Sequence, residues 1–360
     1  MILTLPMTPR SEYQLGYWLT PVIGDILRKR TGQDFVISIG TLGMRNIDAV
    51  FIKNFIEEVS LLKLRCSFWE DTSNRGLLSD RIAEVLPLFR LHNQFVECWV
   101  CNCGALEIPK EQARFLKQKT FYISNGKVFC AKCKQEACLK ILDRVSIFFP
   151  ESQSQEILDN VAVLPGFYLN EFRELLVQFA ENGICINRQR QTGFFYQQYN
   201  IDVEFVWETL LSLLAKKEEI VMVVNNHVLR QTLISILLFR FLGFTNKITL
   251  FITPYISYPG KPDKWQVKKL LELGHDENTV RFMLAASLCW REKDSGLYVD
   301  VSQVEYRRFS LLRKLTQQKI LEKPVATLIS DINHQNLLQG LKNVFNVQKF
   351  DYGKLSGLFS

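Results

Sequence analysis

Six of the nine cysteines in this 360-residue sequence lie between Cys98 and Cys138. Four of these cysteines form two close pairs, and the pairs are Cys101 with Cys103 and Cys130 with Cys133. Two short turns that each present two thiolates suit a tetrahedral Zn²⁺ ion. Four thiolate ligands leave no open position for a catalytic water, so we predict a zinc site with a structural role.

Two neighbouring cysteines leave the ligand set open. Cys98 is an alternative to either member of the first pair, and Cys138 is a weaker candidate. Gly104 follows the first pair and permits the backbone to curl back toward the sulfurs. The 26 residues between Cys103 and Cys130 form a loop that a metal can close without an apolar core of its own. The alternative is a set of buried thiols without a metal.

A second group of candidate residues follows directly on predicted strands. Ligands of open α/β sheets bind beyond the carboxyl ends of the strands, and the amides at a helix N-terminus favour phosphate. An ordinary polar turn or helix cap is the competing explanation at each position. The candidates are Gln14, Gly16 and Tyr17 after the first strand, Gly40 and Thr41 after the second, and Asn225, Asn226 and His227 after a later one.

The elements that position these residues follow from the apolar patterns. Strands are predicted at 2–5, 34–39, 203–207, 220–224 and 248–252, and helices at 17–30, 47–64 and 229–242. Residues 151–185 are predicted to be helical, as are 267–273, 279–288 and 303–321. Strand, helix, strand and helix within the first 65 residues indicate a parallel sheet with right-handed crossovers.

The predicted fold class is α/β: a split Rossmann-like parallel sheet with a zinc-knuckle insertion and a C-terminal helical region. The sheet pattern stops near residue 95, where the cysteines begin, and resumes after residue 200. We therefore predict four parts of the chain. They are a first Rossmann half (1–95), a connective insertion with the zinc knuckle (96–200), a second Rossmann half (201–262) and a helical region (263–360).

Composition limits the functional classes without choosing one. The apolar fraction of 47% supports a sizeable core, and 44 basic against 37 acidic residues leave a net charge of +7. That mild excess permits a polyanionic partner without requiring one. No stretch is long and apolar enough for a membrane span, and we find neither a P-loop nor a Ser-His-Asp arrangement. The N-terminus lacks the features of a signal peptide and the cysteine number is odd, so a cytoplasmic location is expected.

The order of the elements resembles class I aminoacyl-tRNA synthetases of the methionyl branch, from about residue 2 to residue 310. Gln14-Leu15-Gly16-Tyr17 lies where that family has its HIGH signature, and residues 37–43 lie where it has its GTDEHG-type segment. Residues 205–207 resemble a late strand of the second Rossmann half. Residues 223–227 take the place of the GKDN-type segment, and the cysteine knuckle that of the zinc in the connective insertion.

Several signature residues of the family are replaced in this chain. Gln14 and Tyr17 stand at the two histidine positions, whose role in the family is to stabilise ATP phosphates during adenylation. Asn225-Asn226 replaces a lysine-aspartate pair. Residues 257–264 stand in the place of KMSKS, and Lys261 and Lys264 are its remaining cations. About fifty residues follow residue 310, too few for the family's anticodon-binding domain.

The resemblance implies an enzyme that activates an amino acid with ATP and transfers it to a non-standard acceptor, a small amine or hydroxyl compound. Gln14, Gly16 and Tyr17 would hold phosphate and adenosine, and Lys261 or Lys264 would cover the triphosphate. One alternative is a synthetase-derived binding or regulatory module without catalysis. Another is a tRNA ligase without its own anticodon-binding domain; tRNA is a permitted partner but not the favoured one. The oligomeric state stays open.

Overall fold

The computed structural model describes most of the chain up to residue 272. The described residues are 1–43, 49–104, 106–110, 121–149, 154–164, 166–187, 194–214, 219–254, 256–257, 266–272, 274, 277, 280–281, 284 and 297–298. Lys261, Lys264, the predicted helix 303–321 and most of the predicted helix 279–288 lie outside these ranges.

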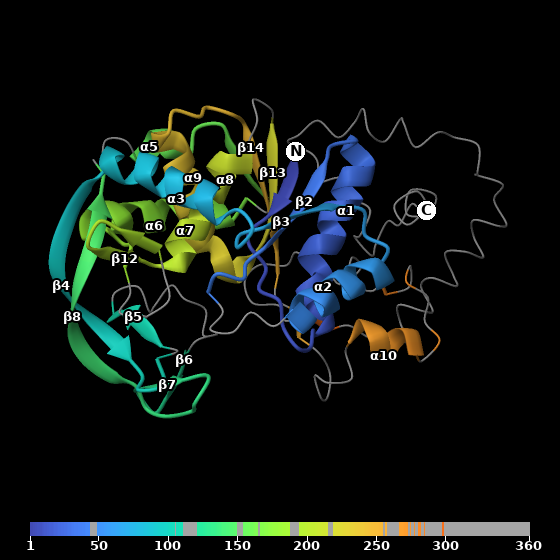
Figure 1. Cartoon of the computed structure of the whole chain (residues 1–360), viewed down its shortest axis with the longest axis horizontal. Helices are drawn as coiled ribbons and strands as arrows, with labels where there is room; N and C mark the ends of the chain where they lie inside the picture. The colour runs from blue at the N-terminus through green and yellow to red at the C-terminus, as the bar shows by residue number, and fades with distance from the viewer. Residues whose placement is uncertain are drawn as a thin grey trace.

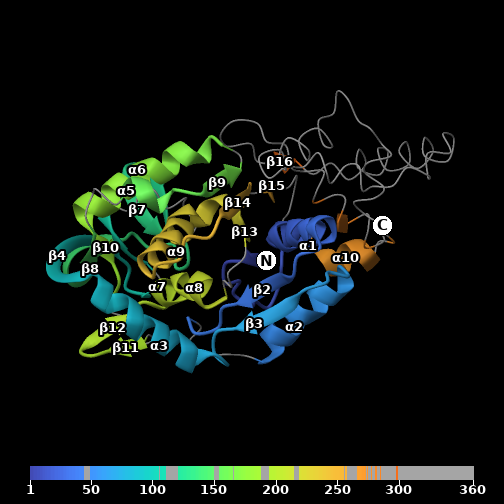
Figure 2. The same ribbon diagram turned by 90° about the horizontal axis from the view of Figure 1, so that it is seen from above.

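A six-stranded parallel sheet forms the centre of the molecule (Figure 1, Figure 2). Its strand order is β3-β2-β1-β13-β14-β9. The strands are β1 (Ile2–Thr4), β2 (Phe35–Ile39), β3 (Ser67–Glu70), β9 (Val161–Leu164), β13 (Ile220–Asn225) and β14 (Ile248–Thr253). β1 pairs with β2 on one side and with β13 on the other, so the two halves of the sheet meet between Leu3 and Met222. The sheet is therefore split in sequence and continuous in space, as predicted.

Helices around the first half enclose one apolar core. A short 3-10 turn, η1 (Leu15–Trp18), leads into α1 (Leu19–Thr31), and α2 (Ala49–Leu61) follows β2. Gly32 ends α1 with a φ of 70°, the left-handed conformation for which glycine is suited. α10 (Val267–Glu272) packs beside α2, and buried Arg281 donates to Asp25 of α1 at 2.6 Å. This late segment thereby joins the first Rossmann half.

Helices of the second half enclose another core, centred on α9 (Leu229–Phe241). The eight consecutive residues of α9 from Thr232 to Phe239 are all buried, and so is Leu229, because the sheet covers one face of the helix and other helices cover the rest. The neighbouring elements are α3 (Arg75–Val85), η2 (Leu86–Leu88), α5 (Ser154–Ile157), α6 (Tyr168–Asn182), α7 (Val203–Glu208), α8 (Leu210–Leu214) and η4 (Asn226–Val228).

The insertion is a long antiparallel ribbon with the cysteines at its far end (Figure 1). β4 (Arg90–Val100) pairs with β8 (Cys138–Phe148) over eleven residue pairs. β5 (Glu107–Pro109) and β10 (Ile184–Cys185) complete that sheet, and β6 (Phe121–Ser124) pairs with β7 (Lys127–Cys130). The remaining short strands are β11 (Phe194–Tyr196), β12 (Tyr199–Ile201), β15 (Ile256–Ser257) and β16 (Leu297–Tyr298).

Two sequence-based predictions are wrong. Residues 203–207 form helix α7 instead of a strand; the Asp202 side chain accepts from the Glu204 amide at 3.1 Å and caps the helix. A short apolar run does not by itself distinguish a strand from a buried helix. Residues 151–185, predicted to be helical throughout, contain β9 between α5 and α6, and β9 is the edge strand of the main sheet beside β14. Within the described ranges, no helix has the length and apolar character that a membrane span requires.

Candidate ligand cleft and metal centre

A cavity of about 1080 Å³ opens at the carboxyl ends of β1 and β13, where the two halves of the sheet meet. Its floor includes Thr4 at the end of β1 and Asn225 at the end of β13, and its wall includes Gly16 and Tyr17 of η1. Strand order reverses at this point of the sheet, and such switch points are where open α/β sheets bind ligands. The cavity brings together five of the predicted cleft residues: Gln14, Gly16, Tyr17, Asn225 and His227.

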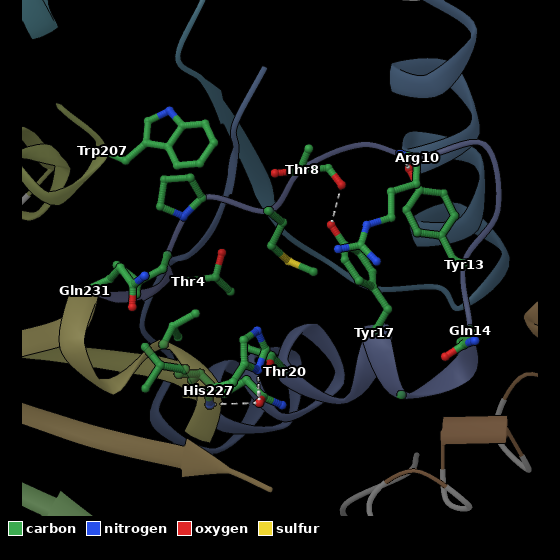
Figure 3. A pocket seen from close by; sticks show the side chains of 18 of the residues that line it. Thr4, Thr8, Arg10, Tyr13, Gln14, Tyr17, Thr20, Trp207, His227 and Gln231 are labelled. Atoms are coloured by element: carbon green, nitrogen blue, oxygen red, sulfur yellow. Dashed lines mark hydrogen bonds between the residues drawn. The ribbon is translucent and has the colours of Figure 1, made fainter. Parts of the chain in front are cut away.

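The turn from Gln14 to Tyr17 is held by hydrogen bonds to its own chain. The Tyr17 hydroxyl donates to the Thr8 carbonyl oxygen at 2.9 Å (Figure 3). The Tyr17 amide donates to the Gln14 carbonyl oxygen at the same distance. Burial raises the pKa of Tyr17 above its usual value, so the phenol stays neutral. Tyr17 therefore anchors the loop that precedes it.

Arg10 brings a cation to this side of the cavity. Its guanidinium carbon lies 5.3 Å from the centroid of the Tyr17 ring, within the range of a cation–π contact. Arg10 lines the cavity, and its backbone amide donates to the Tyr13 hydroxyl at 2.7 Å. Burial raises the pKa of Tyr13 to about 12, and the same ring packs 5.1 Å from Trp18. Because Tyr13 packs on Trp18 and accepts from the Arg10 amide, these aromatic residues hold the backbone of Arg10 in place.

At the end of β13, Asn225 and His227 line the cavity, whereas Asn226 does not. Asn225 caps η4: its side-chain oxygen accepts from the His227 amide at 3.3 Å, and its side-chain amide donates to the Pro254 carbonyl at 3.2 Å. The His227 ring nitrogen Nδ1 also contacts the Asn225 side-chain oxygen. Asn226 does not line the cavity, and its side-chain amide donates to the Tyr168 hydroxyl at 3.3 Å.

Gly40 and Thr41 support the cavity wall from behind without lining it. A Cβ atom on Gly40 would lie 2.8 Å from the Trp207 ring, so the glycine makes room for that indole. Thr41 is buried. Its amide donates to Oδ1 of Asp71 at 2.8 Å, and its hydroxyl donates to the same oxygen at 2.7 Å. Trp207 itself lines the cavity.

The sequence prediction missed one wall of the cavity because it placed a strand where α7 lies. Trp207 and Glu208 follow Glu204 by three and four residues on this helix, and all three side chains line the cavity. Glu208 is only 2% exposed. Gln231, from α9, lines the same cavity. The signal that could have identified α7 is Asp202, a residue type preferred at helix N-caps.

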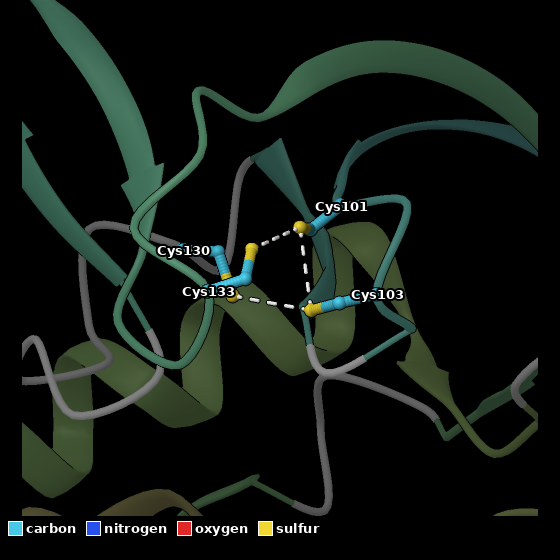
Figure 4. Close-up of side chains that lie close together, drawn as sticks. All are labelled: Cys101, Cys103, Cys130 and Cys133. Atoms are coloured by element: carbon cyan, nitrogen blue, oxygen red, sulfur yellow. Dashed lines mark hydrogen bonds between the residues drawn. The ribbon is translucent and has the colours of Figure 1, made fainter.

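The predicted metal ligands come together at the end of the insertion (Figure 4). The sulfurs of Cys101, Cys103, Cys130 and Cys133 all lie within 4.8 Å of one another. The Cys101 sulfur is 3.0 Å from that of Cys133 and 3.4 Å from that of Cys103. Four sulfurs at Zn–S distances near 2.3 Å in a tetrahedron are roughly 3.8 Å apart, so a small shift of these side chains accommodates the ion.

The other two candidate thiols lie outside this cluster. Cys98 is buried beside Arg144, and the Cys138 sulfur lies 3.5 Å from the Val100 carbonyl oxygen on the neighbouring strand. Gly104 has a φ of 69°, and its amide donates to the Cys101 carbonyl at 2.9 Å, which closes the first turn as predicted. Burial and the neighbouring thiols raise the pKa of Cys101 to about 12, so a bound metal must displace protons.

No protein-family profile and no curated sequence matches this chain. Solved structures similar to this chain include methionyl-tRNA synthetases. That of Mycobacterium tuberculosis bound by methionyl-adenylate has a TM-score of 0.62 and 12% identity, over 99% of this chain and 81% of that one. A second structure in complex with methionyl-adenylate has a TM-score of 0.64 with the same identity and coverage. The apo form has a TM-score of 0.58 and 11% identity, over 99% and 78%. These likenesses confirm the resemblance predicted from the sequence: the chain has the fold of a class I aminoacyl-tRNA synthetase core.

Proposed function

We propose that this protein activates an amino acid with ATP in the cleft and transfers it to a small acceptor. The observation that carries the proposal is the position of the cavity, at the carboxyl ends of β1 and β13, where the two half-sheets meet. Structures of similar fold are titled as complexes with methionyl-adenylate. Those relatives are 12% identical, so the reaction is our proposal for this chain.

The proposed reaction has two balanced steps. A carboxylate oxygen of the amino acid attacks the α-phosphorus of ATP, and pyrophosphate leaves. An amine or hydroxyl of the acceptor then attacks the carbonyl carbon, releases AMP and loses a proton. Gln14 and the Gly16 backbone would contact phosphate or adenosine, and Tyr17 would hold the loop through Thr8. Lys261 and Lys264 stay proposed cations over the triphosphate.

The remaining candidates take contacting and supporting roles in this proposal. Asn225 and His227 line the cavity and would face the nucleotide or the amino acid. Gly40, Thr41 and Asn226 would act through their neighbours, because the first two lie behind Trp207 and Asp71 and the third bonds to Tyr168. A supporting residue changes the shape of the cleft when it is substituted, without removing a ligand contact.

We also propose that the four clustered cysteines hold a structural Zn²⁺ ion, because the fit of their sulfurs to a tetrahedral site is close. The cysteines that the structure describes are all free thiols, and free thiols suit a reducing compartment such as the cytoplasm. The proposed partners are an amino acid or related small molecule and ATP. Transfer RNA is a weaker candidate.

Amino-acid-dependent exchange of pyrophosphate into ATP tests the activation step. Exchange with one amino acid, absent in a Gln14→Ala, Tyr17→Phe double variant that keeps its circular dichroism, supports the proposal. Silence across the twenty protein amino acids and the common non-protein ones rejects it.

A second candidate function is a binding or regulatory module without catalysis. One observation favours it: the Tyr17 hydroxyl, at a signature histidine position, is already bonded to the Thr8 carbonyl oxygen. Calorimetry with ATP separates the two functions. A dissociation constant for ATP below about 1 mM supports the ligase. Absence of binding at that concentration supports the module.

A further inference from the structure

We infer that Arg10 and Tyr17 act as one oxyanion-binding unit on the wall of the cleft. In this unit the Tyr17 ring holds the guanidinium of Arg10, and the guanidinium contacts the phosphates of the bound nucleotide. The inference rests on the proposed function in taking a nucleotide as a ligand of the cleft. It adds a contacting residue that the sequence patterns did not indicate, and it gives the ring and the hydroxyl of Tyr17 separate roles.

The first support is the availability of the Arg10 side chain. Arg10 is the one arginine or lysine among the described residues that line the cavity, and its side chain is exposed. Within the described part of the chain its guanidinium contacts the Tyr17 ring and forms no ion pair. A guanidinium stays charged at neutral pH and carries several N–H donors. The cavity therefore contains a cation whose donors are available to a ligand.

The second support is the way in which this cation is held. The guanidinium carbon lies 5.3 Å from the centroid of the Tyr17 ring (Figure 3). The Tyr17 hydroxyl donates to the Thr8 carbonyl oxygen at 2.9 Å, which fixes the ring, and the Tyr13 hydroxyl accepts from the Arg10 amide at 2.7 Å. Both ends of the Arg10 side chain are thus positioned before a ligand binds. A side chain that is already ordered loses less conformational entropy on binding.

The third support is the place of Arg10 in the cavity. Arg10 lies on the loop between β1 and η1, beyond the carboxyl end of β1, where open α/β sheets bind ligands. Two glutamates of the lining belong to α7, whose Trp207 lies on the opposite side of the cavity from Arg10 (Figure 3). Glu12 also lines the cavity, and its carboxylate accepts from the Gln266 side-chain amide at 3.3 Å. The Arg10 side is therefore the part of the cavity that suits an anion.

A polyphosphate matches this unit better than a single carboxylate does. An exposed pair of single charges contributes little to binding, because water and salt screen it. A triphosphate presents several charged oxygens to the same guanidinium, and arginine is well suited to paired hydrogen bonds with phosphate oxygens. The affinity that depends on Arg10 should therefore increase with the number of phosphate groups on the ligand.

Calorimetry of the full chain with inorganic tripolyphosphate is the experiment, and Tyr17→Phe and Tyr17→Leu are its matched variants. Both variants lose the hydroxyl and keep the net charge, but only the first keeps an aromatic ring. We expect Tyr17→Phe to bind tripolyphosphate about 2- to 5-fold more tightly than Tyr17→Leu, the value of an exposed cation–π contact. In an Arg10→Gln background the two variants should bind equally.

A second pair of variants keeps the test decisive if Tyr17→Leu does not fold, which circular dichroism shows. Arg10 is exposed, so its substitution should leave the fold intact. Arg10→Gln alone should weaken tripolyphosphate binding by about 10-fold, and Arg10→Lys should recover part of the loss because it keeps the charge.

The outcomes separate this inference from the proposed reaction. Tripolyphosphate binding that depends on Arg10 and on the Tyr17 ring, without pyrophosphate exchange, retains the inference and rejects the activation. Exchange, together with tripolyphosphate binding that Arg10→Gln leaves unchanged, retains the activation and overturns the inference. No binding of tripolyphosphate by the unsubstituted protein also overturns it. Equal binding by folded Tyr17→Phe and Tyr17→Leu overturns it as well, because the ring would then not hold the cation.

Discussion

The indole nitrogen of Trp207 donates a hydrogen bond to Oδ2 of Asp71 at 2.6 Å, and this bond links the two halves of the split sheet. Asp71 follows β3 of the first half, and Trp207 belongs to α7 of the second. The same carboxylate accepts from the amides of Thr41 and Leu42. One buried side chain therefore holds the turn after β2 and the α7 wall of the cavity in a common position.

Replacement of Asp71 by Asn should destabilise the protein by about 2–4 kcal/mol, because the amide group meets donors at both of its ends. The free energy of unfolding in urea measures the change. Asp143→Asn, on the exposed face of β8, is the control and should change it by less than about 0.5 kcal/mol. A double-mutant cycle with Trp207→Phe should show a coupling of about 1–2 kcal/mol. Full additivity would mean that the bond does not join the two halves.

Gly40→Ala should cost about 1–3 kcal/mol, because the added Cβ would lie 2.8 Å from the Trp207 ring and 3.0 Å from the Cβ of Pro6. Gly76→Ala is a matched control, since a Cβ at that position of α3 meets no atom within 4 Å. The control should be neutral or slightly stabilising, as expected for alanine in a helix. In a Trp207→Leu background the cost of Gly40→Ala should fall. If the cost of Gly40→Ala stayed the same in that background, the added Cβ would clash with Pro6 and not with Trp207.

The cysteine cluster should bind one zinc ion per chain, measured by elemental analysis after dialysis. A Cys101→Ser, Cys133→Ser double variant should lose the metal, and protease should then cut between residues 101 and 137 while the six-stranded sheet stays folded. This result is expected because the cluster has its own small core, in which Leu106, Ile108 and Phe121 pack on the cysteines. Cys138→Ser should retain the zinc, since that thiol lies outside the cluster. Zinc loss in the Cys138 variant instead would reassign the ligand set.

The parts of the fold predictable from sequence are those where local pattern and tertiary position agree. Buried parallel strands are nearly continuous apolar runs, so β2, β13 and β14 were predicted within one or two residues. The close pairs of cysteines identified the metal cluster, because a four-ligand site needs short turns. The turn at Gly104 was predictable because a glycine directly after a cysteine pair suits a tight turn, and its φ of 69° is in the left-handed region.

The missed parts depend on contacts that no local pattern contains. β9 is short, and its pairing with β14 defines it as a strand, although helical residues surround it. The four apolar or aromatic positions of α7 fit a strand equally well, so the wall of the cavity that α7 forms was not predicted. The supporting role of Gly40 was likewise hidden, because the indole that needs its missing side chain is distant in the sequence.

Arg10→Gln should weaken ATP binding by about 10-fold if this guanidinium meets the phosphates, the typical effect of losing one charge-assisted hydrogen bond. Arg75→Gln is the matched control: its guanidinium carbon lies 4.8 Å from the Phe194 ring, and it does not line the cavity. The control removes a stacked arginine and the same net charge. Equal weakening by both variants would show a general effect of charge, with no contact at Arg10.

Glu58 makes the stability of the protein fall as the pH rises, which is opposite to the effect of most carboxylates in folded proteins. It is 5% exposed on α2, and burial raises its pKa from 4.5 to about 7, although Lys268 and the Trp18 indole act to lower it. Between these two pH values the unfolded chain ionises this group while the folded chain keeps it protonated. The folded state then binds more protons, so the contribution of Glu58 to stability falls as the pH rises and is at its lowest above pH 7.

Glu58→Gln should therefore leave the free energy of unfolding nearly unchanged at pH 4 and raise it, relative to the unsubstituted protein, by about 1–3 kcal/mol at pH 8. Urea titrations at the two pH values measure the difference. Glu181→Gln, exposed at the end of α6, should show no such dependence. A gain at pH 4 that equals the gain at pH 8 would mean that packing of the amide, and not ionisation of the carboxyl group, causes the stabilisation.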